Sequence, residues 1–332
     1  MTARLPALLA TLACCALLAG AGSELPTRRI RLAVGSRPGN LVYLQVDLAR
    51  TLGYFAAEGL DVEFMHFQAG TAASDALVSG KAEFSGNSID HAIQLRAQGT
   101  DLRMIASFTN LPTVTLVVRR DLRPRIRTIR DLKGARLGVT ALGAGTHVLA
   151  AWILKKAGCS IDDVTVVPVG AGQSLIQAMQ DKKIDAAMAT DPTTTELLMS
   201  GQASILLDLV TYDETQRVFN GGYQFTGLLT RPDVVARRPD WAQKMVNAIV
   251  KADHFIATHS AAEISAVLGQ EGYIYVKSLE HSRPSFSKDG KVTADAVANN
   301  IQSQIAFGAV RASTRLDPAS FFDMTFVHRA LK

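Results

Sequence analysis

Short runs of Gly, Ser, Thr, Asn and Asp recur along the sequence, each between a predicted strand and a predicted helix. These residues cap helices and leave main-chain N–H groups pointing outward, which suits them to hold an anion or another polar group. Capping alone would also explain any single run, so a binding role requires several runs to face one another across a cleft. The runs are Ser36-Arg37-Pro38-Gly39-Asn40, Ala69-Gly70-Thr71, Gly86-Asn87-Ser88-Ile89-Asp90, Thr109-Asn110, Ala144-Gly145-Thr146-His147, Gly170-Ala171-Gly172-Gln173-Ser174 and Thr190-Asp191-Pro192-Thr193.

The candidate ligand-binding residues come from these runs and from one later aromatic residue. Asp90 and Asp191 would repel an anion unless they face away or pair with a cation. A ligand with an amino or aminopyrimidine group would suit such carboxylates, with Tyr43, Phe108, Tyr223 or Phe225 as apolar walls. The charge of the ligand therefore stays open. The candidates are Ser36, Asn40, Gly70, Thr71, Asn87, Ser88, Asp90, Asn110, Gly145, Thr146, His147, Asp191 and Tyr223.

Catalytic and metal-binding patterns have little support in this sequence. Its 7 histidines are scattered, and no pair has metal-ligand spacing with a third partner. The Gly143–Thr146 run lacks the lysine of a phosphate loop, and neither Gly-x-Gly-x-x-Gly nor Gly-x-Ser-x-Gly occurs. His147 stands just inside a predicted helix N-terminus, where the helix dipole favours a neutral imidazole. We expect no catalytic residue, no metal and no cofactor.

The elements that position these runs follow a repeated order of short strand, loop and helix, which is typical of a largely parallel sheet covered by helices. Strands are predicted at 30–34, 60–67, 82–85, 102–108, 136–139, 164–168, 184–188, 205–209 and 223–229, with helices at 42–52, 71–78, 89–97, 146–157, 174–180, 193–199 and 239–258. Thr128-Ile129-Arg130-Asp131 predicts a single capped turn.

This order runs through once, breaks at a connector rich in Pro and Arg, and begins again, which predicts two α/β lobes. The mostly helical tail has few strands of its own, so we expect it to pack back on the first lobe. The chain would then cross between lobes twice, near 113–120 and 223–230. The expected division is 29–118 for lobe I, 119–222 for lobe II and 223–332 for the return to lobe I.

The N-terminal segment has the features of a secretory signal peptide. Arg4 precedes the apolar run 5–18, and Ala19-Gly20-Ala21 supplies small residues before a cleavage site near Ala21. A membrane anchor needs about 20 apolar residues, more than this run has. A lipoprotein is a third possibility, because Cys14 and Cys15 lie in the run. Cleavage of residues 1–21 would leave Cys159, which has no partner for an internal disulfide.

The charge and composition exclude few partners, but they argue against nucleic acid. The chain has 332 residues, 48% hydrophobic and 20% charged, with a formal net charge of +5. Much of the basic excess lies in the connector 119–127, without aromatic residues or a recognised motif nearby. A solvated linker explains this stretch, and a docking surface for a membrane partner is the alternative.

Several segments in order resemble the nitrate/sulfonate/taurine-type (SsuA/NMT-like) solute-binding proteins of ABC importers. Residues 52–63 carry the Gly-Tyr-Phe and Glu-Gly-Leu-Asp-Val-Glu pattern, and Asp191-Pro192 follows a strand as in that family; each motif is loose alone, but their order and spacing are specific. Thr193-Thr194 departs from it, because some relatives have aromatic residues there. Further matches are 76–83, 131–139, 145–147, 183–187, 316–318 and 328–331.

The resemblance implies a type II periplasmic-binding fold, with two hinge crossings and a small molecule between the lobes. It implies a monomeric protein in the periplasm that binds a sulfonate-, nitrate- or carboxylate-like or aminopyrimidine-like ligand. It also implies delivery to an ABC permease with a cytoplasmic ATPase. The alternatives are a binding protein that serves a sensor and an enzyme like the thiamine-pyrimidine synthase of the same superfamily. That enzyme is cytoplasmic and has a cluster of closely spaced cysteines, whereas this chain has a signal sequence and would keep only Cys159 after cleavage.

Overall fold

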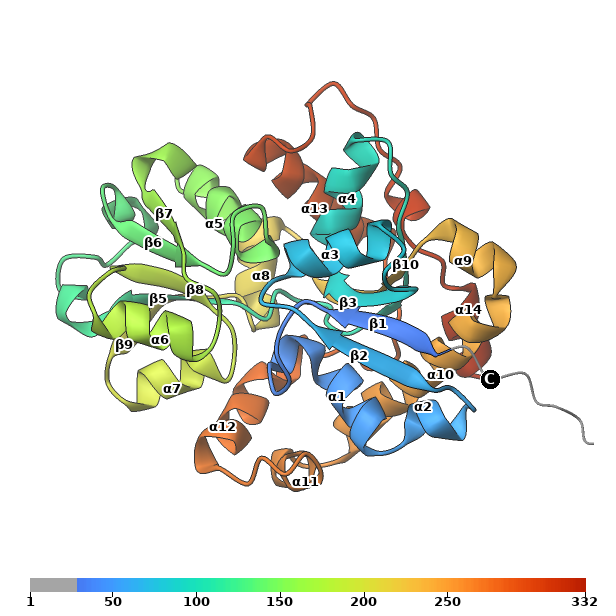
Figure 1. The fold of residues 1–332 in the computed structure, drawn as a ribbon. Coiled ribbons are helices and arrows are strands. Elements are labelled where there is room, and N and C mark those ends of the chain that lie inside the picture. The colour runs from blue at the N-terminus through green and yellow to red at the C-terminus, as the bar shows by residue number, and fades with distance from the viewer. Residues whose placement is uncertain (1–28) are drawn as a thin grey trace, which may run out of the picture.

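The computed structural model describes residues 29–332, so the expected signal peptide at 1–21 lies outside the described residues. The chain forms two α/β lobes, each built on a five-stranded sheet with helices on its faces (Figure 1). None of the helices within residues 29–332 combines the length and the apolar character that a membrane crossing requires.

The sheet of lobe I has the strand order β2-β1-β3-β10-β4. β1, β2, β3 and β4 run parallel, and β10 lies antiparallel between β3 and β4. The strands are β1 (Ile30–Val34), β2 (Val62–His66), β3 (Phe84–Ser88), β4 (Arg103–Ser107) and β10 (Thr226–Thr230).

Lobe II repeats this arrangement in the order β7-β6-β8-β5-β9. β5 takes the antiparallel place between β8 and β9. Asp185, just before β8, links the neighbouring strands β5 and β6 to it, because its carboxylate accepts hydrogen bonds from the side chains of Arg119 and Arg136. The strands are β5 (Thr115–Arg119), β6 (Arg136–Val139), β7 (Thr165–Pro168), β8 (Ala186–Ala189) and β9 (Ala203–Asp208).

The two antiparallel strands are the places where the chain changes lobes. β5 begins the second sheet at Thr115, so the expected boundary after residue 118 falls inside this strand. β10 brings the chain back, and its residues join the first sheet. Each sheet is therefore mixed, because the crossing strand enters it from the other lobe.

The helices lie close to their predicted positions, and several are set by local capping. Ser88 caps α4 through its hydroxyl, and Asp131 accepts the Thr128 N–H in the capping box that the sequence predicts. The α-helices up to the second crossing are α1 (Leu44–Thr51), α2 (Tyr54–Ala57), α3 (Gly70–Val78), α4 (Ile89–Ala97), α5 (Gly145–Lys156), α6 (Gln173–Gln180), α7 (Thr193–Met199) and α8 (Tyr212–Phe219), with short 3-10 turns η1 (Leu41–Tyr43), η2 (Arg120–Leu122), η3 (Ile129–Leu132) and η4 (Ile161–Asp163).

The return segment is helical and packs on lobe I, as the sequence predicts. α10 lies against α1, β4 and α14, while α12 and α13 extend to α7 and α5 of lobe II (Figure 1). Its elements are α9 (Pro232–Arg237), α10 (Pro239–Thr258), α11 (Ala261–Val267), α12 (Tyr273–Ser282), η5 (Arg283–Ser285), α13 (Ala294–Phe307), η6 (Pro318–Phe321) and α14 (Thr325–Ala330).

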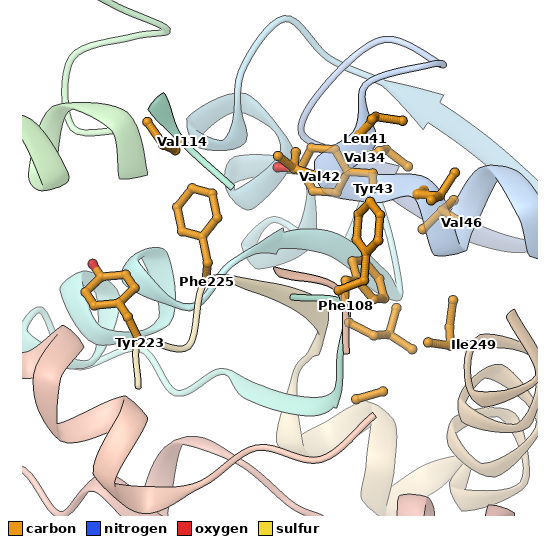
Figure 2. Close-up of a cluster of buried hydrophobic side chains, with 14 of the residues drawn as sticks. Val34, Leu41, Val42, Tyr43, Val46, Phe108, Val114, Tyr223, Phe225 and Ile249 are labelled. Atoms are coloured by element: carbon orange, nitrogen blue, oxygen red, sulfur yellow. The ribbon is translucent and has the colours of Figure 1, made fainter. Parts of the chain in front are cut away.

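The largest apolar core runs under the site and is continuous between the lobes. Figure 2 shows Tyr43, Phe108 and Phe225 within it, beside Val114 at the first crossing and Tyr223 at the second. Burying side chains of this kind stabilises the fold by about 1.5–3 kcal/mol each. The loops above this core therefore rest on a packed, rigid base.

Candidate functional site

A cavity of about 50 Å³ lies between the lobes at the carboxyl ends of β1, β3 and β6. Within residues 29–332, no Asp, Glu, Lys or Arg lines it, and its lining combines polar and apolar side chains. It continues into a wider mouth that includes Arg37, Glu196 and Tyr275. The cavity is lined by Gly35, Ser36, Asn40, Val42, Tyr43, Gln68, Gly70, Asn87, Ser88, His91, Phe225 and Thr226 of lobe I, and by Thr140, Ala144, Gly145, Thr146, Ala171 and Thr190 of lobe II.

Two helices begin at this cavity, one from each lobe. α3 begins at Gly70 after an extended Ala69, and α5 begins at Gly145 after an extended Ala144, without a side-chain cap in either case. Within residues 29–332, no acceptor bonds the N–H groups of Gly70, Gly145 or Thr146. Glycine leaves the first turn open, and the two N-termini direct positive dipole ends to the same space.

Two buried side chains of lobe I also lack hydrogen-bond partners at the cavity. Tyr43 is 7% exposed and His91 is 4% exposed, and neither the phenol nor the imidazole has a partner among the described residues. Burial lowers the pKa of His91 to about 4, so its ring is neutral near pH 7. A neutral imidazole offers one donor and one acceptor, and a phenol offers both. A bound molecule can satisfy these groups.

The buried carboxylate of Asp90 is not part of the cavity lining, although its Oδ2 lies beside two lining residues, Ser88 and Gly145. Its Oδ1 accepts hydrogen bonds from Tyr223 Oη at 3.2 Å and Gln304 Nε2 at 2.9 Å, and from Asn300 Nδ2. Its Oδ2 accepts the Ser88 hydroxyl at 2.8 Å. Burial raises the pKa of Asp90 although these donors oppose the shift. Asp90 therefore joins α4 to the return segment, and its carboxylate is satisfied by donors of the protein.

The carboxylate of Asp191 also has its hydrogen-bond partners in residues that do not line the cavity. Its Oδ1 accepts the N–H and hydroxyl of Thr195 in α7, at 3.0 and 2.8 Å. Its Oδ2 meets His281 Nδ1 at 2.6 Å and accepts the Ser282 hydroxyl at 2.8 Å. These carboxylates were the reason to doubt an anionic ligand, and neither lines the cavity.

The structure brings together about half of the predicted site residues. Those that line the cavity are Ser36, Asn40, Gly70, Asn87, Ser88, Gly145 and Thr146. Outside the lining, Thr71 follows Gly70 in α3, and Asn110 is exposed at the crossing. His147 accepts the Gly143 N–H and packs edge-on against Phe307. Tyr223 is buried with its hydroxyl on Asp90 and Ser303.

Sequence reasoning missed Gln68, His91 and Thr140 in the lining, and it placed Thr190 in a loop run without selecting it as a candidate. Thr140 and Thr190 directly follow β6 and β8, so the rule of strand ends could have found them. His91 stands three residues after the capping Ser88, on the same face of the helix. The three-residue spacing from Ser88 is the sequence feature from which His91 could have been predicted.

The lobes are closed on one another in this structure. Asn40 Nδ2 donates to Thr190 Oγ1 at 3.4 Å, and the Leu41 N–H donates to the Asp191 carbonyl at 3.2 Å. On the other side, Gln94 donates to the Gly143 carbonyl at 3.2 Å. These contacts hold the N-termini of α3 and α5 over one shared cavity.

Comparisons with known proteins agree with this architecture. A solved structure of a Bordetella bronchiseptica RB50 protein is 30% identical, with a TM-score of 0.83 over 91% of this chain and 96% of that one. The MOPS-bound alkanesulfonate-binding protein SsuA from Xanthomonas axonopodis pv. citri is 20% identical, with a TM-score of 0.71 over 90% of this chain and 98% of that one.

A curated relative carries the name of an enzyme. It is a 4-amino-5-hydroxymethyl-2-methylpyrimidine phosphate synthase from Aspergillus parasiticus, 23% identical over 74% of this chain and 72% of its own length. The family model described as NMT1/THI5 like matches residues 42–262. The fold is that of periplasmic-binding proteins, and the chain belongs to the NMT1/THI5-like family.

Proposed function

We propose that the chain is the extracytoplasmic solute-binding component of an ABC importer and that it captures a small monoanion between its lobes. The observation that carries this proposal is the pair of helix N-termini, at Gly70 and Gly145, on opposite sides of one cavity. Each N-terminus is equivalent to about half a positive charge, so two supply about one unit. Since none of the lining residues within 29–332 has a charged side chain, one negative charge matches this field and a second would be uncompensated.

The contacts of the two questioned carboxylates support an anionic ligand. Asp90 and Asp191 are held by donors of the protein itself, so neither needs a cationic group on the ligand. A sulfonate, nitrate or carboxylate would accept the free N–H groups, while His91 and Tyr43 add neutral donors. A ligand with a larger body can extend into the mouth beside Tyr275.

Closure of the lobes provides the signal for a membrane partner. Contacts from a ligand to both helix N-termini stabilise the closed state over the open one, so binding shifts the hinge equilibrium. A permease that docks on both lobes distinguishes the loaded protein from the empty one by this shape. Periplasmic location and delivery to a permease with its ATPase belong to this proposal.

An aminopyrimidine is the second candidate ligand, and the name of the curated relative favours it. The neutral His91, the phenol of Tyr43 and the ring of Phe225 would suit a flat heteroaromatic molecule. A synthase on this scaffold would need reactive groups in addition. Cys159 is the free cysteine within residues 29–332, and the same part of the chain holds no group of three or more metal-ligating side chains.

A thermal-shift experiment on the mature protein decides between these ligands. The panel contains ethanesulfonate, nitrate and benzoate, ethylamine as the cationic match of ethanesulfonate, and 4-aminopyrimidine. A ligand at one hundred times its Kd adds about 2.7 kcal/mol to the free energy of unfolding. We expect stabilisation by a monoanion and none by ethylamine. Stabilisation by 4-aminopyrimidine alone would favour the second candidate, and no shift across a wider panel would contradict a binding function.

A further inference from the structure

His281 is the histidine of α12 whose two ring nitrogens both face carboxylates. Nδ1 lies 2.6 Å from Asp191 Oδ2, and Nε2 lies 2.9 Å from Asp208 Oδ2. Asp191 belongs to the loop between β8 and α7, and Asp208 ends β9, so both carboxylates are part of lobe II. His281 is 24% exposed, whereas Asp191 is 1% and Asp208 19% exposed.

The remaining contacts of these carboxylates fix the direction of both hydrogen bonds. Asp191 accepts from Thr195 and Ser282, and Asp208 Oδ1 accepts from the Thr115 hydroxyl and the Val210 N–H. Each carboxylate therefore acts as an acceptor, and each ring nitrogen of His281 must donate. A neutral imidazole has one N–H and cannot do this, whereas an imidazolium has two. A protonated His281 therefore satisfies both carboxylates at once.

The C-terminal end of α12, which carries His281, is joined to lobe I by hydrogen bonds of the residues that follow it. Arg283 donates to the carbonyls of Ile256 and His259 at the end of α10, at 2.8 and 2.6 Å. The Ser287 N–H donates to the Phe108 carbonyl at 2.8 Å. Figure 1 shows α12 below the gap between the sheets, where it contacts α7 of lobe II and η1 of lobe I. The ion pairs of His281 therefore cross from one lobe to the other.

The other charged groups around α12 have partners elsewhere. Glu280 pairs with Lys277 on the same helix, and Arg283 points to α10. From α7, Glu196 accepts the Gln173 amide, and from α11, Glu263 caps its own helix at Ser260. η1 brings Tyr43, whose phenol lines the cavity. Asp191 and Asp208 are thus the charged groups that bond His281.

We propose that His281 is a positioning residue for ligand capture, and that its protonated ring latches the lobes closed through Asp191 and Asp208. Asp191 connects the ion pairs of His281 to the binding cavity. Its carbonyl accepts the Leu41 N–H across the cleft, and its neighbour Thr190 lines the cavity. Loss of the proton leaves one carboxylate facing an imidazole lone pair, which weakens the closed state. This inference rests on the proposed capture of a ligand by lobe closure.

The latch makes closure depend on pH in a defined direction. Burial disfavours the charged ring, but the hydrogen bonds and charges of Asp191 and Asp208 outweigh it and raise the pKa of His281 to about 10 from its ordinary 6.5. Opening separates the ring from these carboxylates, so closure takes up a proton between these two pKa values. The stabilisation is complete below pH 6.5 and is lost as the pH rises towards 10, by at most about tenfold in the closure equilibrium per pH unit.

The test measures the pKa of the His281 ring by NMR and the separation of the lobes by small-angle X-ray scattering, both without added ligand. The variants are His281→Gln and Asp208→Asn, and His254→Gln is the control, since His254 is an exposed histidine that forms no ion pair within residues 29–332. We expect the wild-type ring to titrate above pH 8, and the radius of gyration to rise between pH 7 and 10. Asp208→Asn should lower the ring pKa, and His281→Gln should abolish the change in radius, while the control behaves as wild type. A wild-type ring that titrates near pH 6.5, or a radius that does not change with pH, overturns the latch.

Calorimetry with ethanesulfonate adds a functional measurement, because a sulfonate keeps one negative charge throughout this range. We expect a loss of about tenfold or more in affinity from pH 7 to 9 in wild type and a flat profile in His281→Gln. Equal pH profiles of affinity in wild type and His281→Gln overturn the latch. A His281 with a purely structural role would change the affinity without changing the pH dependence of the affinity. Absence of ethanesulfonate binding at pH 6 counts against the proposed sulfonate ligand, and the ligand-free measurements then still decide the latch.

Discussion

Gly145 offers a sharp test of closure, because this lobe II residue packs closely against lobe I at the cavity. A Cβ added at this position would lie 2.8 Å from Cε2 of Phe225, 3.0 Å from Oδ2 of Asp90 and 3.3 Å from Oγ of Ser88. All three atoms belong to lobe I or to the strand that returns to it. The substitution Gly145→Ala therefore obstructs the closed arrangement and leaves lobe II itself unobstructed.

The neighbours have little freedom to move. Phe225 is 4% exposed in the core, and the Asp90 carboxylate is held by four donors. Overpacking of this kind costs about 1–3 kcal/mol. Since about 1.4 kcal/mol is a factor of ten, the closed state and the affinity should fall about 5- to 150-fold. The fold should not suffer, because alanine favours a helix over glycine by up to about 1 kcal/mol.

The assay combines calorimetric affinity for the monoanion that stabilises the wild-type protein most with thermal unfolding in the absence of ligand. We expect weaker binding by Gly145→Ala together with an unchanged or higher Tm. Gly272→Ala is the matched control, since a Cβ there would meet no atom within 4 Å. Affinity within a factor of two of wild type for Gly145→Ala would refute the closed geometry as the binding state. A fall in Tm of several degrees would show instead that the lobe itself is disturbed.

Two further predictions concern the buried polar groups of α4. Asp90→Ala leaves Asn300 and Gln304 without their buried acceptor, so the free energy of unfolding should fall by about 2–4 kcal/mol in denaturant titrations. An unchanged midpoint would contradict the Asp90 network. The depressed pKa of His91, about 4 against an ordinary 6.5, means that the unfolded chain binds the extra proton as the pH falls. His91 therefore destabilises the fold between pH 6.5 and 4, and His91→Gln should flatten this part of the stability profile. Parallel profiles of the two proteins would show that His91 is not buried in its neutral form.

Much of the fold follows from local patterns in the sequence. β1, α4, β6, α7 and α10 have the bounds that their apolar runs and caps predict, because each depends on neighbours in the chain. The second repeat of the strand–helix order predicts a second lobe, and the return crossing near 223–230 follows from the change in composition. α8 lay outside these predictions, because its charged sequence Tyr212–Phe219 lacks a clear apolar period.

The candidate site is predicted in part for the same reason. The rule that ligands bind at the carboxyl ends of parallel strands selects the loops of Ser36, Gly70, Asn87 and Gly145, and all four residues line the cavity. This rule did not select His91, because His91 lies in the first turn of α4 and not in the loop before it. Its exposure to the cavity depends on glycine at Gly70, whose added Cβ would approach His91 Nε2 to 2.6 Å.

The sequence by itself determined the two lobes, the crossings and the loops at which a ligand can bind, since these depend on periodicity, capping and turn residues. Only the tertiary structure decided which way Asp90 and Asp191 face and what they bind. Their partners Gln304 and His281 stand 214 and 90 residues further along the chain. No local pattern encodes a contact at such separation. The orientation of a carboxylate is set by the donors that packing brings to it, and that packing removes both negative charges from the cavity lining.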